Sequence, residues 1–244
     1  MPLLITDDGG KLLYKSRTFP KSDAAFIIHA TADTPDGILH IEQKSIYLRE
    51  VLLSGKRYRF YMDFDRLTEC YGFSAERASE ALFDLSALAK QRQTIPLNTL
   101  THLFADEYAR ALRDGGVKLS LRALAQSEAV NIPINAVLLC LTLMVRLCAL
   151  HGKAVRLSAV RDSGFVTLYA DADCSAQPSE AGEVLETLLH EVAAAAGLSA
   201  AYTETDGHCA WSLCLAPPDI GMAGFKVPLA NVQANCRVYA EMFL

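Results

Sequence analysis

The longest mainly apolar run in the chain is AVLLCLTLMVRLCAL, which spans residues 136–150. A run that is apolar around most of a helical circumference predicts a helix buried on nearly all sides. Asn131 is a candidate N-cap, Pro133 suits the first helical turn, and Gly152 marks the break that follows. We therefore expect a core helix over residues 133–151.

The residues after this helix alternate between apolar and polar side chains. Val155 and Leu157 alternate with Arg156 and Ser158, and a second alternating segment follows the turn at residues 161–164. Alternation with a period of two predicts strands with one covered face. A long apolar helix beneath such a hairpin predicts a two-layer α/β sandwich.

The first 64 residues contain several short alternating segments separated by turn signals. Residues 3–15 read as a hairpin around Asp8-Gly9-Gly10, and residues 38–53 and 58–64 read as further strands. The segment AAFIIHA at residues 24–30 is also read as a strand, so His29 and His40 both fall in strand patterns. The pattern predicts a small antiparallel sheet.

Helical spacing replaces the alternation between residues 73 and 116. The segments 73–92 and 97–116 each carry apolar residues at intervals of three or four, and the short connection Thr94-Ile95-Pro96 separates them. Two such helices predict an αα-hairpin. Because a lone hairpin buries little apolar surface, we expect it to pair with a second copy as a four-helix bundle, which makes the protein a homodimer.

The remaining elements complete an α+β chain. A strand begins near Gly116, a helix over residues 183–196 is ended by Gly197, and two strands flank Gly207. We divide the chain into residues 1–64, a small antiparallel sheet; 65–115, an αα-hairpin; 116–218, a two-layer α/β sandwich; and 219–244, a tail that packs on a neighbouring element.

Composition narrows the classes of function. The chain has 244 residues, a net charge of −5 and seven cysteines, none of them in a CxxC pair. An acidic chain gives no support to nucleic-acid binding, and scattered cysteines suit a reducing compartment better than a zinc site. The run 136–150 is shorter than the roughly 20 residues of a membrane span. We expect a cytoplasmic protein with no metal site.

The order of elements from residue 117 to 216 resembles the ATP-binding domain of sensor histidine kinases, the fold shared with gyrase, the Hsp90 chaperone and MutL. The clearest part is LETLLHEVAAAAGLSAAYTETDGHCAWSLCLAP, which resembles the closing helix and hairpin of that domain. At the other end, ITDDGGKLLY resembles the first hairpin of a PAS sensor domain. The resemblance implies a PAS-like region, a dimerisation and phosphotransfer hairpin, and an ATPase-type domain.

The residues that carry chemistry in that family are replaced here. Where the resemblance implies an Asn that binds Mg²⁺, this chain has Met144 or Cys140, and neither side chain offers the hard oxygen ligand that Mg²⁺ prefers. Asp171, with Asp173 as second choice, stands where the family has an adenine-binding Asp, but no glycine follows it. The glycine-rich lid is reduced to SEAG at residues 179–182. We expect no tight Mg–ATP binding and no other cofactor.

The phosphoacceptor histidine of the family is also displaced. The segment 73–92 contains no histidine, and His102 in the following helix is the only one in the hairpin. Asp106 lies one turn later, close enough along a helix to orient the imidazole. His102 is therefore the candidate phosphoacceptor.

These observations favour a dimeric signalling protein that resembles a sensor histidine kinase, has a degenerate ATPase domain and acts by binding. Its expected partners are a response regulator or a partner kinase in a two-component pathway. Two alternatives stay open: a histidine phosphotransferase that uses His102, and an active kinase with an atypical ATP site.

Overall fold

The computed structural model describes residues 3–17, 19, 21–65, 85–90, 92–122, 129–162, 164–174, 179–215 and 229–243. The chain forms two compact units, Met1–Asp84 with Glu241–Phe243, and Leu85–Ala240 with Leu244. Most of the first predicted helix, residues 73–84, lies outside the described residues.

The N-terminal unit contains the predicted antiparallel sheet. Its strands are β1 (Leu3–Asp7), β2 (Leu12–Lys15), β3 (Gly37–Ile41), β4 (Lys44–Leu53) and β5 (Lys56–Asp63), in the spatial order β2-β1-β5-β4-β3. All neighbouring strands pair antiparallel. The β1–β2 turn includes Gly10 at a φ of 79°, a left-handed conformation that favours glycine.

The segment that was expected to form a strand at residues 24–30 belongs to a helix, α1 (Lys21–Ala30). Ala24 and Ile27 lie one helical turn apart and are buried against Leu4 and Tyr61 of the sheet. The Thr31 hydroxyl donates to the Ile27 carbonyl oxygen at 2.7 Å, at the end of the helix. Packing of this apolar pair on the sheet therefore decided that the segment is a helix, and His29 lies in its last turn.

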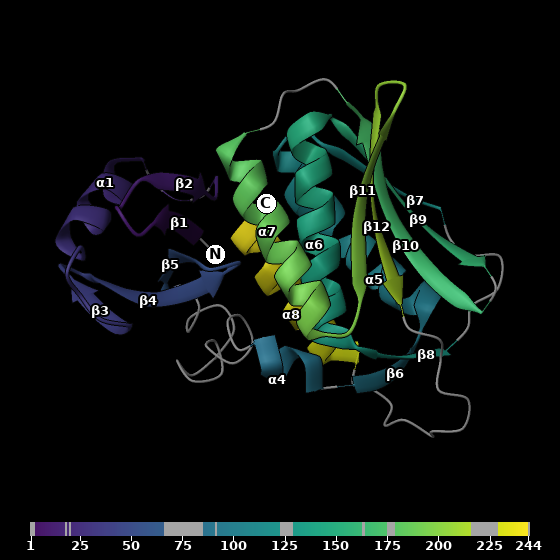
Figure 1. Cartoon of the computed structure of the whole chain (residues 1–244), viewed down its shortest axis with the longest axis horizontal. Helices are drawn as coiled ribbons and strands as arrows, with labels where there is room; N and C mark the ends of the chain where they lie inside the picture. The colour runs from purple at the N-terminus through teal and green to yellow at the C-terminus, as the bar shows by residue number, and fades with distance from the viewer. Residues whose placement is uncertain are drawn as a thin grey trace. The chain divides into compact units, whose positions relative to one another are not determined.

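The larger unit is built on a mixed sheet. Its strands are β7 (Lys118–Arg122), β9 (Ala154–Asp162), β10 (Phe165–Asp173), β11 (Ser199–Thr205) and β12 (His208–Leu215), in the order β11-β12-β10-β9-β7. Only the β7–β9 pair is parallel among these neighbours. Helices α6 (Ile134–His151) and α7 (Glu180–Ala195) lie on one face of this sheet (Figure 1). The predicted two-layer α/β sandwich is confirmed.

Helix α6 is the core helix that the apolar run predicts. Its side chains from Ala136 to Val145 are all buried. Among the described residues it is the one helix with the length and hydropathy to cross a membrane, and 78% of that span is buried inside the protein. The burial is what a core helix requires.

The N-terminus of α6 differs from the prediction that Asn131 is its N-cap. Residues 129–133 form strand β8 (Ala129–Pro133), which pairs with β6 (Arg92–Pro96), so Asn131 lies opposite Thr94 and is not the N-cap. Pro133 occupies the N-cap position. The connection expected at residues 94–96 is likewise a strand, because pairing with β8 satisfies backbone groups that a free loop would leave to water.

The second predicted helix is present as α5 (Leu97–Asp114), and α4 (Leu85–Lys90) is the described part of the first. The apolar face of α5 is buried within the larger unit, where the Tyr108 hydroxyl bonds to the Thr142 hydroxyl of α6. The terminal segment contains helix α8 (Leu229–Phe243), which binds α5 through Glu107 and α6 through Asn135.

Candidate functional site

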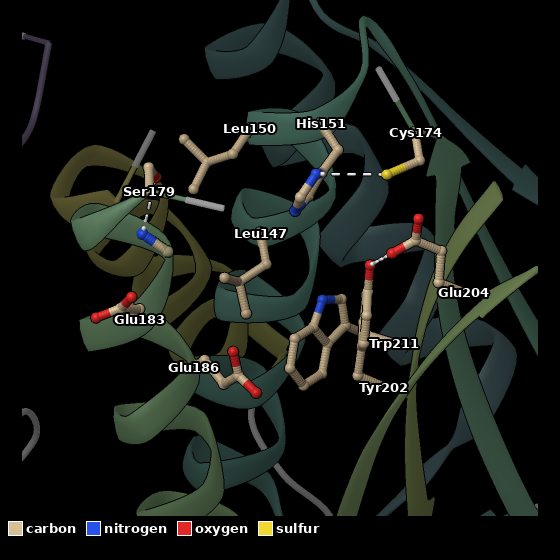
Figure 2. Close-up of a pocket in the computed structure, with 11 residues that line it drawn as sticks. Leu147, Leu150, His151, Cys174, Ser179, Glu183, Glu186, Tyr202, Glu204 and Trp211 are labelled. Carbon is tan, nitrogen blue, oxygen red and sulfur yellow. Dashed lines mark hydrogen bonds between the residues drawn. The ribbon is translucent and has the colours of Figure 1, made fainter. Parts of the chain in front are cut away.

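The larger unit contains a cavity of about 350 Å³ between the C-terminal half of α6, the first turns of α7 and the β11–β12 hairpin (Figure 2). Helix α6 contributes Leu147, Leu150 and His151. The start of α7 contributes Ser179, Gly182, Glu183 and Glu186, and the sheet contributes Cys174, Tyr202, Glu204 and Trp211.

The N-terminus of α7 is held by a side-chain cap. Ser179 is the N-cap, and its hydroxyl oxygen accepts a hydrogen bond from the Gly182 N–H at 3.1 Å. Glu183 and Glu186 follow at a spacing of three residues, which places both on one face of the helix. Figure 2 shows both carboxylates on the α7 side of the cavity.

The end of α6 lies unusually close to the end of β10. A Cβ atom on Gly152 would sit 2.6 Å from the Asp173 carbonyl oxygen, so only glycine fits without movement of the backbone. This approach places the His151 ring beside Cys174, with 3.6 Å between Nδ1 and the sulfur. The histidine thereby belongs to the cavity wall and not to open solvent.

Two aromatic rings form the opposite wall. Tyr202 and Trp211 are directly paired residues of β11 and β12, and their ring centroids are 5.0 Å apart. The Tyr202 hydroxyl donates to Glu204 at 2.8 Å, and burial together with that carboxylate raises the Tyr202 pKa. Trp211 is only 2% exposed, and its indole Nε1 is buried without a hydrogen-bond partner among the described residues.

The charge of the cavity is negative. Three glutamates line it, and the described lining contains no lysine or arginine. The triphosphate of a nucleotide would meet carboxylates where a phosphate site supplies N–H donors or cations. In the part of the chain that the structure describes, no group of three or more His, Cys, Asp or Glu side chains is placed to hold a metal ion. Among its side chains, the described lining offers a phosphate group no lysine or arginine.

Asp171, the predicted remnant of a nucleotide site, does not line this cavity. Its carboxylate accepts a hydrogen bond from the Arg156 Nε at 2.5 Å. Ala170 and Ala172, the neighbours of Asp171 on β10, are buried, so alternation along the strand directs Asp171 to the opposite face of the sheet. Asp173 is exposed and pairs with His208 at 2.9 Å.

Cys140 and Met144, the residues aligned with the magnesium-binding Asn, are both fully buried in the core. Burial raises the pKa of the Cys140 thiol, which suits a structural role. The side chains of α6 that face the cavity lie further along the helix, at Leu147, Leu150 and His151. Cys140 and Met144 therefore do not line this cavity.

His102 and Asp106 are both exposed on α5 and do not line the cavity. On α7, His190 Nε2 lies 3.9 Å from a Glu186 carboxylate oxygen, and both side chains are about half exposed. Sequence reasoning did not single out Glu183, Glu204 or Tyr202, which line the cavity. The two α7 glutamates at a spacing of three residues were a usable signal, whereas the approach of β11 to α7 was not visible in the sequence.

The N-terminal unit has a second hollow of about 420 Å³ next to the β1–β2 turn. Asp8, Ile28, His29 and Arg59 are among its lining residues. The Arg59 guanidinium donates to the carbonyl oxygens of Thr31 and Ala32 at 2.9 and 2.6 Å, so its main contacts are structural.

No protein-family model and no curated protein matches the chain. Among solved structures it is similar to a histidine kinase from Burkholderia phymatum STM815, with 17% identity, a TM-score of 0.44 and coverage of 55% of this chain and 75% of that one. The Acinetobacter baumannii histidine kinase AdeS has 11% identity and a TM-score of 0.45 over 63% and 83% of the two chains. The blue-light-activated histidine kinase EL346 of Erythrobacter litoralis has 12% identity and a TM-score of 0.43 over 88% and 94%. Each of these three neighbours is a histidine kinase.

Proposed function

We propose that the protein is a histidine-kinase-like signalling protein whose ATPase-type domain does not phosphorylate and acts by binding. It would serve as a dimeric sensor or scaffold in a two-component pathway, in contact with a response regulator or a partner kinase. The supporting sequence features are the layout of residues 117–216 and the PAS-like opening ITDDGGKLLY.

The observation that carries the proposal is the chemistry of the cavity beside α6 and α7. Its described lining has three glutamates and no lysine or arginine. Asp171 is engaged with Arg156 on the other face of the sheet. A domain with this arrangement would retain a hollow for recognition, and its described lining offers no lysine or arginine to a nucleotide triphosphate.

Calorimetric titration of the full chain with Mg–ATP tests this proposal, with MgCl₂ alone as the control. We expect no saturable heat at micromolar nucleotide and no autophosphorylation with labelled ATP. Micromolar Mg–ATP binding would overturn it and would favour the active kinase with an atypical site.

Dimerisation is part of the same proposal, and its surface needs revision. The bundle was expected to use the apolar face of residues 97–116, but Leu100, Phe104 and Tyr108 on that face are buried within their own unit. A homodimer through the helical hairpin would therefore use a surface other than this face of α5. Light scattering coupled to gel filtration measures the mass directly, and a monomer at micromolar concentration would contradict this part of the proposal.

The phosphotransferase remains a second candidate because His102 is exposed on α5, with exposed Asp106 one turn later. An exposed imidazole is accessible to a phosphorylated receiver domain. The cavity plays no part in that alternative.

A further inference from the structure

The cavity between α6, α7 and the β11–β12 hairpin combines an apolar interior with an acidic rim. Leu147 is buried, Leu150 is partly buried, and the Trp211 ring closes the sheet side. Glu183, Glu186 and Glu204 are more exposed and stand around this interior. The volume of about 350 Å³ falls in the range of about 300–1,000 Å³ that is typical of small-molecule sites.

The rim carboxylates come from two sides of the cavity. Figure 2 shows Glu183 and Glu186 on α7 and Glu204 across from them on β11. Glu204 uses Oε2 to accept from Tyr202, which leaves Oε1 available to a ligand. Glu186 Oε1 lies 3.9 Å from His190 Nε2. Because both side chains are about half exposed, this interaction is weak.

The aromatic wall adds a second feature that suits a positive charge. The Tyr202 and Trp211 rings meet at an angle of 42° with centroids 5.0 Å apart, and both residues line the cavity. The face of an indole or phenol ring attracts ammonium and guanidinium groups. Carboxylates beside aromatic faces form an environment that stabilises an organic cation and repels an anion.

The buried indole nitrogen of Trp211 is independent evidence for a ligand, because it lacks a hydrogen-bond acceptor among the described residues. Trp211 Nε1 is a donor, it is buried, and no acceptor contacts it among the described residues. In Figure 2 the indole nitrogen points into the space between Leu147 and His151. Since buried donors are normally hydrogen-bonded, a ligand atom that accepts from Nε1 would complete the site.

We propose that this cavity binds a small organic cation, an ammonium or guanidinium group on an apolar body that also carries a hydrogen-bond acceptor. The rim glutamates bind the cationic head, the leucines and aromatic rings cover the body, and Trp211 Nε1 donates to the acceptor. The inference deepens the proposed binding function and rests on it in one respect, that Mg–ATP does not occupy the cavity. A free amine and a basic side chain of a partner protein share this chemistry.

Ligand binding can be measured through the fluorescence of Trp211, because it is the only tryptophan in the chain. The full-length protein is titrated with tyramine, with its neutral analogue tyrosol and with its anionic analogue 4-hydroxyphenylacetate, while Trp211 fluorescence is recorded. We expect saturable binding of tyramine, at least about tenfold weaker binding of tyrosol, and none of the anion, because hydrogen bonds to charged groups contribute more than neutral ones. Equal affinity for tyramine and tyrosol, or no saturable response to tyramine or to the peptide below, would overturn the proposal.

Variants locate the binding site. Glu204→Gln and the double change Glu183→Gln with Glu186→Gln are each expected to weaken tyramine by about tenfold and to leave tyrosol unchanged. Asp114→Asn removes one negative charge from the exposed end of α5 and serves as the control. Loss of tyramine affinity in the control to the same degree would show general charge attraction and would contradict the assignment.

A capped peptide that contains arginine separates the two sources of the cation. Saturation of the Trp211 signal by the peptide alone assigns the site to a basic partner segment, and saturation by tyramine alone assigns it to a free amine. Both results support the cation chemistry. Mg–ATP that displaces the bound probe would refute the proposed function as well, whereas failure of both probes with no Mg–ATP binding refutes only this inference.

Discussion

Glu107 of α5 and Arg237 of α8 form a two-pronged ion pair, with Nε to Oε2 at 2.9 Å and Nη2 to Oε1 at 3.2 Å. Gln233 Nε2 donates to the same carboxylate at 2.6 Å. The Glu107 side chain is 11% exposed and the Arg237 side chain is 50% exposed. These contacts join two helices through Glu107 and Arg237, which are 130 residues apart in the sequence.

Removal of this pair should loosen α8. We expect Arg237→Ala to lower the free energy of unfolding by about 1 kcal/mol, since a half-exposed arginine contributes less than a buried one. Urea unfolding followed by circular dichroism measures the change. Asp106→Asn, an exposed change one residue before Glu107, is the matched control and should shift stability by less than about 0.5 kcal/mol. Equal effects of the two variants would contradict a specific role for the pair.

The same carboxylate should make stability depend on acid pH. The Arg237 guanidinium, assisted by Gln233, lowers the pKa of Glu107 below its ordinary value. A lowered folded-state pKa contributes stability above the unfolded pKa of about 4.3, and that contribution disappears as the pH falls through the folded-state value. Glu107→Gln should therefore be less stable than the wild type at neutral pH and should converge with it in acid. Parallel stability profiles of the two proteins would refute the linkage.

Removing either partner of the buried Tyr108–Thr142 hydrogen bond should lower the stability of the protein by a different amount. Thr142 Oγ1 donates to the Leu138 carbonyl oxygen at 2.7 Å, so Tyr108 is the donor in the bond between the hydroxyls. Tyr108→Phe leaves Thr142 with a partner and should cost about 1 kcal/mol. Thr142→Val leaves the fully buried Tyr108 hydroxyl without its acceptor and should lower the free energy of unfolding by more, about 1–3 kcal/mol. Thermal unfolding compares them, and the reverse order would refute the donor assignment.

Gly152 should be intolerant of any side chain. A Cβ atom there would contact the Asp173 carbonyl oxygen at 2.6 Å, so Gly152→Ala forces the end of α6 away from β10 at a cost of about 1–3 kcal/mol. Gly182→Ala is the control, because its Cβ atom would meet its neighbours at ordinary distances of 3.5 and 3.9 Å. An alanine in the helix should leave stability unchanged or raise it slightly. Calorimetric unfolding temperatures that ranked the two variants the other way would exclude the clash.

His102 distinguishes binding from phosphotransfer. A protein that acts only by binding should acquire no acid-labile phosphate when it is mixed with a phosphorylated receiver domain. Labelling of the wild type that His102→Gln abolishes would establish the phosphotransferase alternative. The Asp106→Asn variant then tests whether the neighbouring carboxylate orients the imidazole, through a slower transfer rate with the acceptor still present.

The sequence by itself determined most of the secondary structure. The apolar circumference of residues 136–150 predicted α6, and the alternation around Leu157 and Leu168 predicted β9 and β10, because local periodicity reports which face is covered. It failed at residues 24–30, where an apolar run of seven residues suits a strand or a helix. Only packing of Ala24 and Ile27 on the sheet decided that segment. The sequence also did not predict the pairing of β6 with β8. That pairing joins Thr94 to Asn131, and a local pattern carries no information about residues so far apart in the sequence.

The candidate site depended on the tertiary structure. Alternation on β10 directs Asp171 away from the helices, but the choice of the covered face comes from α6 and not from the strand itself. The cavity exists because Gly152 lets α6 approach β10 and because β11 brings Tyr202 and Glu204 opposite the α7 glutamates. A sequence records the residues on each element, whereas the contacts between elements decide which of them face one another. That physical difference is why the sequence predicted the α/β layer and the structure alone showed an acidic, aromatic cavity within it.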